Sequence, residues 1–523
     1  MVRPTLLSGD GPMARPTVAG ALSKITFMPV QNLTLFIPEL LLCALAIGVL
    51  MLDLFLGRDQ KRWLPIVAVA GLLAFAVTAM LQWDPSRAPV LEFWGSYSID
   101  SFAVFFKVLF ALVGVLIVLL STDFFRKVYA YGEYFSLLLF ALFGMVLLAG
   151  AVDLITIYLA FELVSLVSYV LAGYLRRDAK SNEASLKYFL YGAAASAVMI
   201  YGMSLLYGLG GSTNLHTLAD RLASGSTAAT WGFLPEGLQS GPLNALALIL
   251  ILTGLGYKVA MAPFQAWSPD AYEGSPTPVT AFLSVGPKAA GFAILLRFLL
   301  IVAPALVPQW QVILAILATL TMFVGNLLAI RQTSLKRMLA YSSIAHAGYL
   351  LIGVVAAGSQ AGWGLPAVMY YLVAYLFMNL GAFGYALLLE KNTGSDNING
   401  FIGLAKGSLA DALVLVAFLM ALTGLPPTAG FVGKFYIFAA AIRSGSWWWL
   451  AAVGVINSAI SLFFYMNIAR LMFFNEERAA LVQRPRGITF VIWLSLIMTL
   501  GLCAFPGPLL ALAQQAGSLL AGY

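Results

Sequence analysis

The stretch LTGLGYKVAMAPFQAW, residues 252–267, carries the strongest structural signal in the chain, because it places Lys258 inside an apolar segment and follows it with Pro263. A related stretch, LTGLPPTAGFVGKF, occupies residues 422–435. It begins with the same four letters and again combines a proline break with a lysine, Lys434. A proline removes a backbone hydrogen bond and interrupts a helix. Both stretches therefore predict broken helices that carry a charge.

The composition is that of a membrane protein. Of the 523 residues, 61% are hydrophobic and only 10% are charged, and the mean hydropathy of +0.92 is far above that of soluble domains. The net charge of +7 comes from lysines and arginines spread through short loops between apolar runs. This pattern is typical of membrane orientation and not of nucleic-acid binding. A lipid bilayer is therefore expected around the chain, and nucleic acid is not expected as a partner.

The sequence argues against chemistry by this chain itself. Cys43 and Cys503 are each isolated in an apolar run, so no disulfide framework, zinc site or iron–sulfur site is predicted. Neither a glycine-rich phosphate loop nor a hydrolytic triad is recognisable, and the chain has only two histidines, His216 and His346. We therefore expect no redox centre, metal or cofactor in this chain.

Apolar runs of about 20 residues, each long enough to cross a hydrocarbon layer of about 30 Å, recur along the chain. They are too long for barrel strands, and they lack the alternation of polar and apolar residues that such strands show. They therefore predict an all-α integral membrane protein with about fourteen transmembrane helices. The runs lie at 33–56, 63–82, 99–121, 134–151, 153–174, 183–207, 243–266, 277–300, 308–330, 337–357, 364–390, 409–442, 446–474 and 486–513.

Lysine and arginine are distributed unevenly between alternate loops. If both termini lie on the outer side, the cytoplasmic loops hold sixteen of these residues, whereas the opposite loops hold Arg87, Arg221 and Arg443. The positive-inside rule therefore predicts a multi-pass protein of the bacterial plasma membrane with both termini on the periplasmic side. Residues 1–28 are polar and lack the apolar core of a signal peptide, so they are excluded from the predicted fold.

The shared LTGL falls on predicted helices seven and twelve, which are five helices apart and so run in opposite directions. This pattern predicts an inverted-topology repeat, with helices four to eight and nine to thirteen as its units. A chance match of four common membrane residues is the alternative, but the shared proline break and lysine favour the repeat. The predicted divisions are the polar extension, helices one to three, the first repeat, the inverted second repeat, and helix fourteen with the C-terminus: 1–28, 29–130, 131–303, 304–475 and 476–523.

Seven basic residues fall inside predicted helices. A charge at the bilayer centre costs about 2.5–3.5 kcal/mol, so such residues face the protein interior or water and often mark an ion path. Arg297 and Arg470 lie near helix ends, where the side chain can extend to the interface, and a structural role is favoured for both. Lys187 is about one turn inside its helix, so a relay role and an interfacial role are both open. The seven are Lys107, Lys187, Lys258, Lys288, Arg297, Lys434 and Arg470.

Lys258, Lys288 and Lys434 are too far from their helix ends to reach the interface easily, and each lies close to proline or glycine. Such breaks free backbone groups that water or polar side chains must satisfy, so polar surroundings are expected. An amine removed from water releases its proton more readily, because burial disfavours the charged form. The three lysines are therefore candidates for a proton relay. Lys107 lies outside the predicted repeats, and its role stays open.

Glu162 is the carboxylate that stands out, about nine residues inside predicted helix five. An unpaired buried carboxylate is costly and a buried lysine is its natural partner, so we predict a pair with Lys258 that works in the relay; a passive structural ion pair is the alternative. Glu39 and Asp53 lie near the ends of predicted helix one and are interpreted as structural or interfacial. His346 is a candidate proton shuttle, with a packing role as the alternative.

Three long motifs resemble the antiporter-like subunits of respiratory complex I, and most of all its N-type subunits. They are KVAMAPFQAWSPDAYEGSPTPVTAFLSVGPKAAGF (258–292), SLKRMLAYSSIAHAGYLL (334–351) and LTGLPPTAGFVGKF (422–435), and the resemblance runs from about residue 30 to the C-terminus. It implies a proton-translocating subunit of an NADH:quinone oxidoreductase. It also implies other membrane and peripheral subunits as partners, in which NADH, FMN, iron–sulfur clusters and quinone are expected.

The family's scheme implies roles for the residues selected above. Glu162 is expected to pair with Lys258 on broken helix seven, Lys288 to link two half-channels, and Lys434 on broken helix twelve to serve the other end of the path. The chain departs from the family at Gln265, where many members have histidine. Glutamine does not titrate, so proton transfer at that point would need water or the other candidate shuttle.

Two other functions remain open from sequence. A subunit of a multi-subunit sodium/proton antiporter would have the same fold and no electron donor. A passive scaffold would use the buried charges only to hold helices together. Direct quinone binding is a weaker hypothesis, because no residue or motif in the sequence indicates it. The polypeptides that copurify with this chain would distinguish a complex I subunit from an antiporter subunit.

Overall fold

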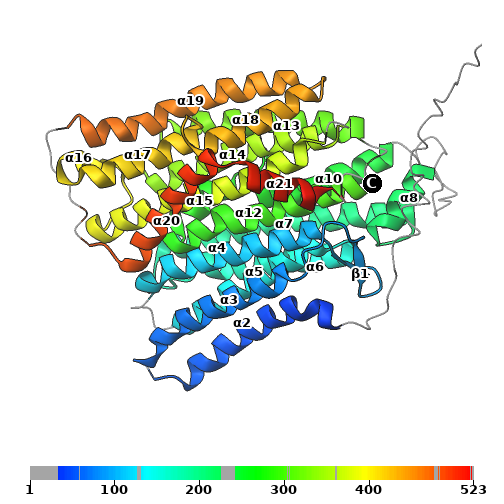
Figure 1. Ribbon diagram of the computed structural model, residues 1–523, viewed down its shortest axis with the longest axis horizontal. Coiled ribbons are helices and arrows are strands. Elements are labelled where there is room, and N and C mark those ends of the chain that lie inside the picture. The colour runs from blue at the N-terminus through cyan, green and yellow to red at the C-terminus, as the bar shows by residue number, and fades with distance from the viewer. Residues whose placement is uncertain are drawn as a thin grey trace, which may run out of the picture.

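The computed structural model describes residues 33–523 apart from 58, 126–130, 225–241, 303, 305–306, 360–361, 476–480, 482, 519 and 521–523. The predicted polar extension, 1–28, therefore lies outside the described residues. The described chain is a bundle of helices that run roughly side by side along the long axis of the molecule (Figure 1). Thirteen of its helices are long and apolar enough to cross a membrane, and one shorter apolar helix is also present. The predicted all-α membrane fold is confirmed.

The first two long helices of the N-terminal group form one edge of the bundle, at the bottom of Figure 1. Pro38 and Pro65 lie in the first turns of its first two helices, where the missing N–H costs nothing. A small antiparallel hairpin precedes the third helix and pairs Val90 with Ile99. The sequence did not predict this hairpin, because strands of three residues leave no readable alternation. The elements are η1 (Leu33–Phe36), α2 (Ile37–Phe55), η2 (Gln60–Trp63), α3 (Leu64–Met80), β1 (Val90–Glu92), β2 (Tyr97–Ile99) and α4 (Ser101–Phe125).

The next unit contains the first predicted broken helix. Its fourth spanning segment stops at Val259 and resumes at Trp267, as the proline in the opening stretch predicts. The short helix α8, which the sequence analysis missed, follows the long helix α7. The helices are α5 (Tyr131–Gly150), α6 (Leu154–Ala172), α7 (Ala179–Gly210), α8 (Leu215–Ser224), α10 (Pro242–Val259), α11 (Trp267–Gly274) and α12 (Thr277–Val302).

The following unit repeats this order of long helices, again with the break in its fourth segment. This break lies between Thr423 and Ala429, which confirms the second predicted interruption. The shared order supports the inverted repeat, which stays a prediction. The elements are α13 (Val307–Ala329), α14 (Leu335–Ala357), α15 (Gly364–Thr393), η4 (Ile398–Phe401), α16 (Leu404–Gly407), α17 (Leu409–Thr423), α18 (Ala429–Arg443) and α19 (Trp448–Phe473).

The C-terminal region differs from the prediction of one helix over 486–513. It forms α20 (Arg486–Ala504) and α21 (Gly507–Gly517), separated at Phe505 and Pro506. Pro506 has no N–H to continue the hydrogen-bond ladder of the preceding helix, which explains the division. The second helix packs against α15 and α4 with a few buried residues and leaves most of its side chains exposed.

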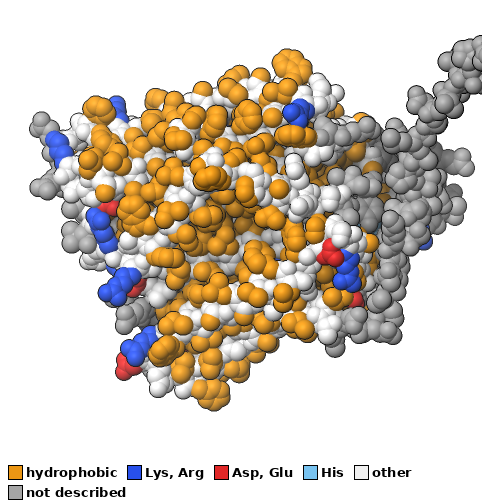
Figure 2. Space-filling model, viewed as in Figure 1, with side chains coloured by type: hydrophobic (Ala, Val, Ile, Leu, Met, Phe, Trp, Pro, Cys, Tyr) orange, Lys and Arg blue, Asp and Glu red, His pale blue; other side chains and the backbone are white. Residues whose placement is uncertain are grey.

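The helices differ greatly in how far they are buried. In α12, α14 and α15 nearly every residue of the apolar segment is buried, whereas in α2, α3, α19 and α20 the buried share is only 28–39%. Figure 2 shows hydrophobic side chains over the middle of the molecule and most charged side chains near the two ends of the helices. The first set therefore forms the core, and a charge placed on it has no route to lipid.

Candidate functional site

Side-chain hydrogen bonds stabilise the backbone at the break between α10 and α11. The indole Nε1 of Trp267 donates a hydrogen bond of 3.0 Å to the carbonyl oxygen of Tyr257, which also accepts from the Ala260 N–H at 3.1 Å where α10 ends. The backbone N–H of Ala262 donates to the hydroxyl of Thr321 on α13, also at 3.0 Å. The break is therefore satisfied within the protein, as a membrane-embedded break must be.

Lys258 lies in the last turn of α10 and is only 3% exposed. Its Nζ donates to the Ser165 hydroxyl on α6 at 2.8 Å and lies 4.6 Å from the centre of the Phe161 ring. On the other side, a Cβ atom at Gly291 of α12 would lie 3.3 Å from the Cγ of the lysine. The missing side chain of Gly291 thus lets the lysine stem pass between α6 and α12.

The Glu162 carboxylate lies one turn before Ser165 on α6, but its hydrogen-bond partner is on another helix. Its Oε1 accepts a hydrogen bond from the Ser196 hydroxyl of α7. The ion pairs of the described residues do not include one between Glu162 and Lys258. The predicted partners therefore do not form a direct ion pair, and Lys258 instead bonds the serine one turn from Glu162 on α6.

Lys288 lies on the fully buried helix α12, directly after Pro287. Its Nζ donates to both the backbone carbonyl and the hydroxyl of Ser343 on α14. The same atom lies 5.7 Å from the centre of the Tyr375 ring of α15. The amine thus reaches the contact between the two units, because it extends from the last helix of the first unit to two helices of the second.

Lys434 lies after its break, on α18, and reaches back across it. Its Nζ donates to the carbonyl oxygens of Thr423 at 2.7 Å and Leu422 at 3.2 Å, both in the last turn of α17. It also donates to Ser458 of α19 at 2.9 Å and lies 4.1 Å from the centre of the Tyr349 ring. The carbonyls freed by the broken helix therefore hold the amine, as expected for a cation at a helix C-terminus.

His346 lies between the last two lysines. Its Nδ1 is 2.6 Å from the Tyr371 hydroxyl, and its ring centre lies 5.0 Å from that of Tyr375 and 5.7 Å from that of Tyr349. Tyr375 is the ring beside Lys288, and Tyr349 is the ring beside Lys434. The predicted shuttle is therefore placed where it can connect the two amines.

Gly424 provides the space that Lys434 needs. It has a φ of +87°, and a Cβ atom there would lie 2.7 Å from the lysine Cδ. We expect Gly424→Ala to displace the amine from its carbonyl partners and to slow proton transfer through the predicted relay several-fold, measured in membrane vesicles. Gly394→Ala is the matched control, because Gly394 also has a positive φ, +71°, but nothing within 4 Å of its Cβ position. Equal losses in the two variants would mean that backbone strain alone is responsible.

Lys187 belongs to a different group of charges. It is 39% exposed, and its Nζ contacts Asp270 at 2.8 Å and Glu183 at 2.7 Å. Arg337 contacts both Asp270 and Glu273 at 2.8 Å. Burial tends to raise the pKa of Asp270, but the hydrogen bonds from Lys187 and Arg337 lower it below its ordinary value. The structure therefore places Lys187 in an ion-pair cluster at the ends of α7, α11 and α14, apart from the row of buried lysines.

The interfacial role predicted for Arg297 is wrong. The residue is 1% exposed; its two Nη atoms bond the Asp100 carboxylate at 2.8 and 2.9 Å, and its Nε bonds the Ala149 carbonyl at 2.8 Å. Burial of α12 on all sides leaves its end no access to lipid or solvent. Burial tends to raise the pKa of Asp100, but the charge of Arg297 lowers it below its ordinary value. Arg470, in contrast, is exposed as predicted.

Lys107 and Glu39 form a second buried ion pair that the sequence analysis missed. Both side chains are 0% exposed, with Nζ and Oε1 2.5 Å apart. Lys107 also donates to Gln82 at 2.9 Å, and the Tyr97 hydroxyl donates to Glu39 at 2.8 Å. Glu39 is therefore structural and not interfacial. Asp53 pairs with the half-exposed Lys61 near the other end of α2.

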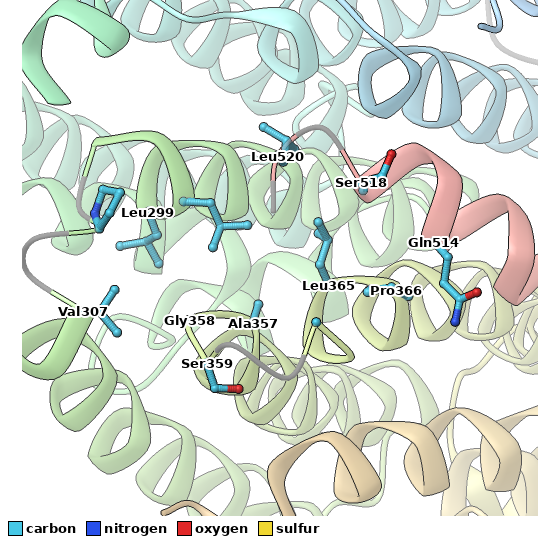
Figure 3. Close-up of a pocket in the computed structure, with 14 residues that line it drawn as sticks. Leu299, Val307, Ala357, Gly358, Ser359, Leu365, Pro366, Gln514, Ser518 and Leu520 are labelled. Atoms are coloured by element: carbon cyan, nitrogen blue, oxygen red, sulfur yellow. The ribbon is translucent and has the colours of Figure 1, made fainter. Parts of the chain in front are cut away.

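Gln265 lies inside the first break, and its Oε1 is buried without a partner among the described residues. A separate cavity lies elsewhere in the described chain. It has a volume of about 380 Å³ and opens among the ends of α12, α13, α14, α15 and α21 (Figure 3). Its described lining is mostly apolar, with Gln514, Ser359 and Ser518 as polar members, and includes none of the candidate relay residues. This cavity is therefore not part of the site.

Two interrupted helices and a row of buried amines are typical of ion-translocating membrane subunits. Comparison with protein families supports this class. A family model described as NADH:quinone oxidoreductase/Mrp antiporter, transmembrane region, matches residues 151–461. A second model, the N-terminal region of NAD(P)H-quinone oxidoreductase subunit 2, matches residues 24–123.

Individual relatives narrow the class. NADH-quinone oxidoreductase subunit N of Trichlorobacter lovleyi is 40% identical over 495 residues, which cover 94% of this chain and 98% of the relative. NAD(P)H-quinone oxidoreductase subunit 2 of Synechococcus sp. is 44% identical over 444 residues, covering 84% and 80%. The chain belongs to the family of N subunits of NADH-quinone oxidoreductase, which are proton-translocating membrane subunits of complex I.

Solved structures support the same assignment. A chain of respiratory complex I from Thermus thermophilus with bound aureothin is 33% identical, with a TM-score of 0.74, and the match covers 91% of this chain and 99% of that one. A chain of the Mrp complex from Dietzia sp. has a TM-score of 0.75 at 20% identity, covering 93% and 98%. The second similarity shows the shared fold alone. Other subunits of complex I are partners of this chain.

Proposed function

We propose that protons cross this subunit along a path formed by Glu162, Lys258, Lys288, His346 and Lys434. The observation that carries the proposal is the placement of His346 between two buried amines, each of which contacts a tyrosine ring beside it. Lys258 extends the row towards α6, where Glu162 lies. Lys258, Lys288, His346 and Lys434 are buried, and Glu162 at the end of the row is partly buried.

Coupling in this path is electrostatic. A carboxylate close to an amine favours the protonated form of that amine, and moving or neutralising the carboxylate removes this preference. A change at Glu162 would therefore push a proton from Lys258 towards Lys288 and then Lys434. The inverted repeat would supply one half-channel to each side of the membrane.

The driving reaction takes place in other subunits. Within the described residues, no group of three or more His, Cys, Asp and Glu side chains could hold a metal ion. We assign NADH, FMN, the iron–sulfur clusters and quinone to the partner subunits and no redox centre to this chain. The excess of lysine and arginine on alternate loops supports a placement in which both termini lie on the periplasmic side.

The test compares two lysine replacements in the assembled complex. Lys258→Met is expected to lower the number of protons translocated per NADH oxidised, because it removes the amine beside Glu162. Lys187→Met is the control, since that lysine belongs to the exposed ion-pair cluster and should leave the ratio unchanged. Proton release is measured in membrane vesicles, with copurification of partner subunits as the measure of assembly. A fully assembled Lys258→Met complex with the normal ratio would refute the path.

A further inference from the structure

The carboxylate of Glu162 lies between two sets of partners on different helices. On one side, the Ser196 hydroxyl of α7 donates a hydrogen bond to it. On the other side, one turn further along α6, Ser165 accepts a hydrogen bond from the Lys258 amine at 2.8 Å. Residues three apart on a helix are neighbours on one face, so Glu162 and Ser165 lie on adjacent turns of the same surface.

We propose that Ser196 is a positioning residue that holds Glu162 on the α7 side of this surface, so that a direct Glu162–Lys258 ion pair forms only when the Ser196 hydrogen bond opens. The inference rests on the path proposed above and adds a residue to it. A rotation of the glutamate side chain about its own torsions is enough to exchange one partner for the other, and no helix needs to move.

The surroundings of Ser196 are consistent with a role in positioning Glu162. Its side chain is 5% exposed, and its Oγ has the Tyr158 hydroxyl as a second neighbour at 3.5 Å. Other serines of these helices bond the backbone instead: Ser165 and Ser168 donate to carbonyls four residues earlier on α6, and Ser204 donates to the Tyr201 carbonyl on α7. Ser196 therefore differs in directing its hydroxyl to a charged side chain on a neighbouring helix.

Competition for the carboxylate would control the proton on Lys258. Attraction between opposite charges falls with distance, and it is strong where water is excluded. While Ser196 holds the carboxylate, Lys258 is held by a neutral hydroxyl and can pass on its proton. When the carboxylate moves to the amine, direct pairing retains the proton there. Ser196 thus keeps the Glu162 carboxylate apart from the Lys258 amine. Loss of the Ser196 hydroxyl would favour the direct Glu162–Lys258 ion pair.

The experiment uses purified complex in which this subunit carries Ser196→Ala, Ser196→Cys or Ser196→Thr. Infrared difference spectra, with Glu162→Gln as the reference, identify the bands of the Glu162 carboxyl group. Ser196→Ala and Ser196→Cys are expected to shift these bands and to slow NADH-driven proton translocation about tenfold, the loss expected for one hydrogen bond to a charged group. Ser196→Thr keeps the hydroxyl and is expected to restore both. Ser204→Ala, on the same helix, should match the parent.

The infrared bands are read without turnover, so they report on Ser196 independently of the wider path. Unshifted Glu162 bands in Ser196→Ala and Ser196→Cys would overturn the inference even if translocation slowed. A failure of assembled Ser196→Thr to restore bands shifted by Ser196→Ala would also overturn it, because packing and not the hydroxyl would then be responsible. Failure of the proposed path, in contrast, would appear as normal translocation in Lys258→Met.

Discussion

Replacing Lys288 with methionine is expected to slow proton transfer through this subunit by about 100-fold or more, the contribution of a positioned proton-transfer group. Methionine is apolar and similar in length, so it should fill the same space in α12 without disturbing the packing. The amine of Lys288 extends from the first unit to Ser343 and Tyr375 of the second. Without it, Lys258 and the His346–Lys434 pair are no longer connected.

The measurement is proton release per NADH oxidised in vesicles that contain equal amounts of assembled complex. Lys406→Met is the matched control, because Lys406 is exposed on α16 and lies outside the row. His346→Phe should give a smaller loss, since the ring packing is kept and water can replace a shuttle more easily than an amine. A normal ratio in Lys288→Met would show that protons bypass α12.

The largest effect on stability is expected for Arg297→Met. Its guanidinium satisfies Asp100 with two hydrogen bonds, and removing one partner of a buried pair costs about 3–5 kcal/mol because the other charge is left uncompensated. We expect less subunit in the membrane and a lower temperature of complex dissociation. Adding Asp100→Asn should recover part of the loss, since asparagine is neutral and can still accept from the Ala103 N–H at the start of α4.

Arg470→Met is the control for this variant, because Arg470 is exposed near the end of α19. It should accumulate to the parental level. If Arg297→Met accumulates to that level as well, the buried pair contributes little to assembly. If the double variant is worse than the single one, Asp100 has a role beyond neutralising the arginine.

The features that could be predicted from sequence are those that depend on neighbouring residues along the chain: the membrane spans, the helix breaks and the buried lysines. The apolar runs gave the spans, because a run of hydrophobic residues must cross the bilayer whatever its neighbours are. Pro263 and the pair Pro426 and Pro427 gave the two breaks, because a missing N–H acts within one turn. Lys288 and Lys434 were recognised as buried because a charge far from a helix end has no other place in a membrane.

The contacts between distant segments could not be predicted in this way. Glu39 and Lys107 come from different helices, and Asp100 lies 197 residues before Arg297, so only the packed bundle brings each pair together. The position of Arg297 near a helix end was misleading because α4 and α8 pack against α12, and Asp100 just before α4 pairs with the arginine. Ser196 was missed for a related reason: serine is common in membrane helices, and nothing in its local sequence indicates that its hydroxyl meets Glu162.

The partners of the buried cations divide them into two kinds. Lys107 and Arg297 each bond a carboxylate, so removing a proton from either would leave a bare anion in the core. The hydrogen-bond acceptors of Lys258, Lys288 and Lys434 among the described residues are hydroxyls and backbone carbonyls, which are neutral whether or not the proton is present. The buried cations with charged partners are therefore suited to a permanent structural role, whereas those with neutral partners can lose and regain a proton, as the proposed path requires.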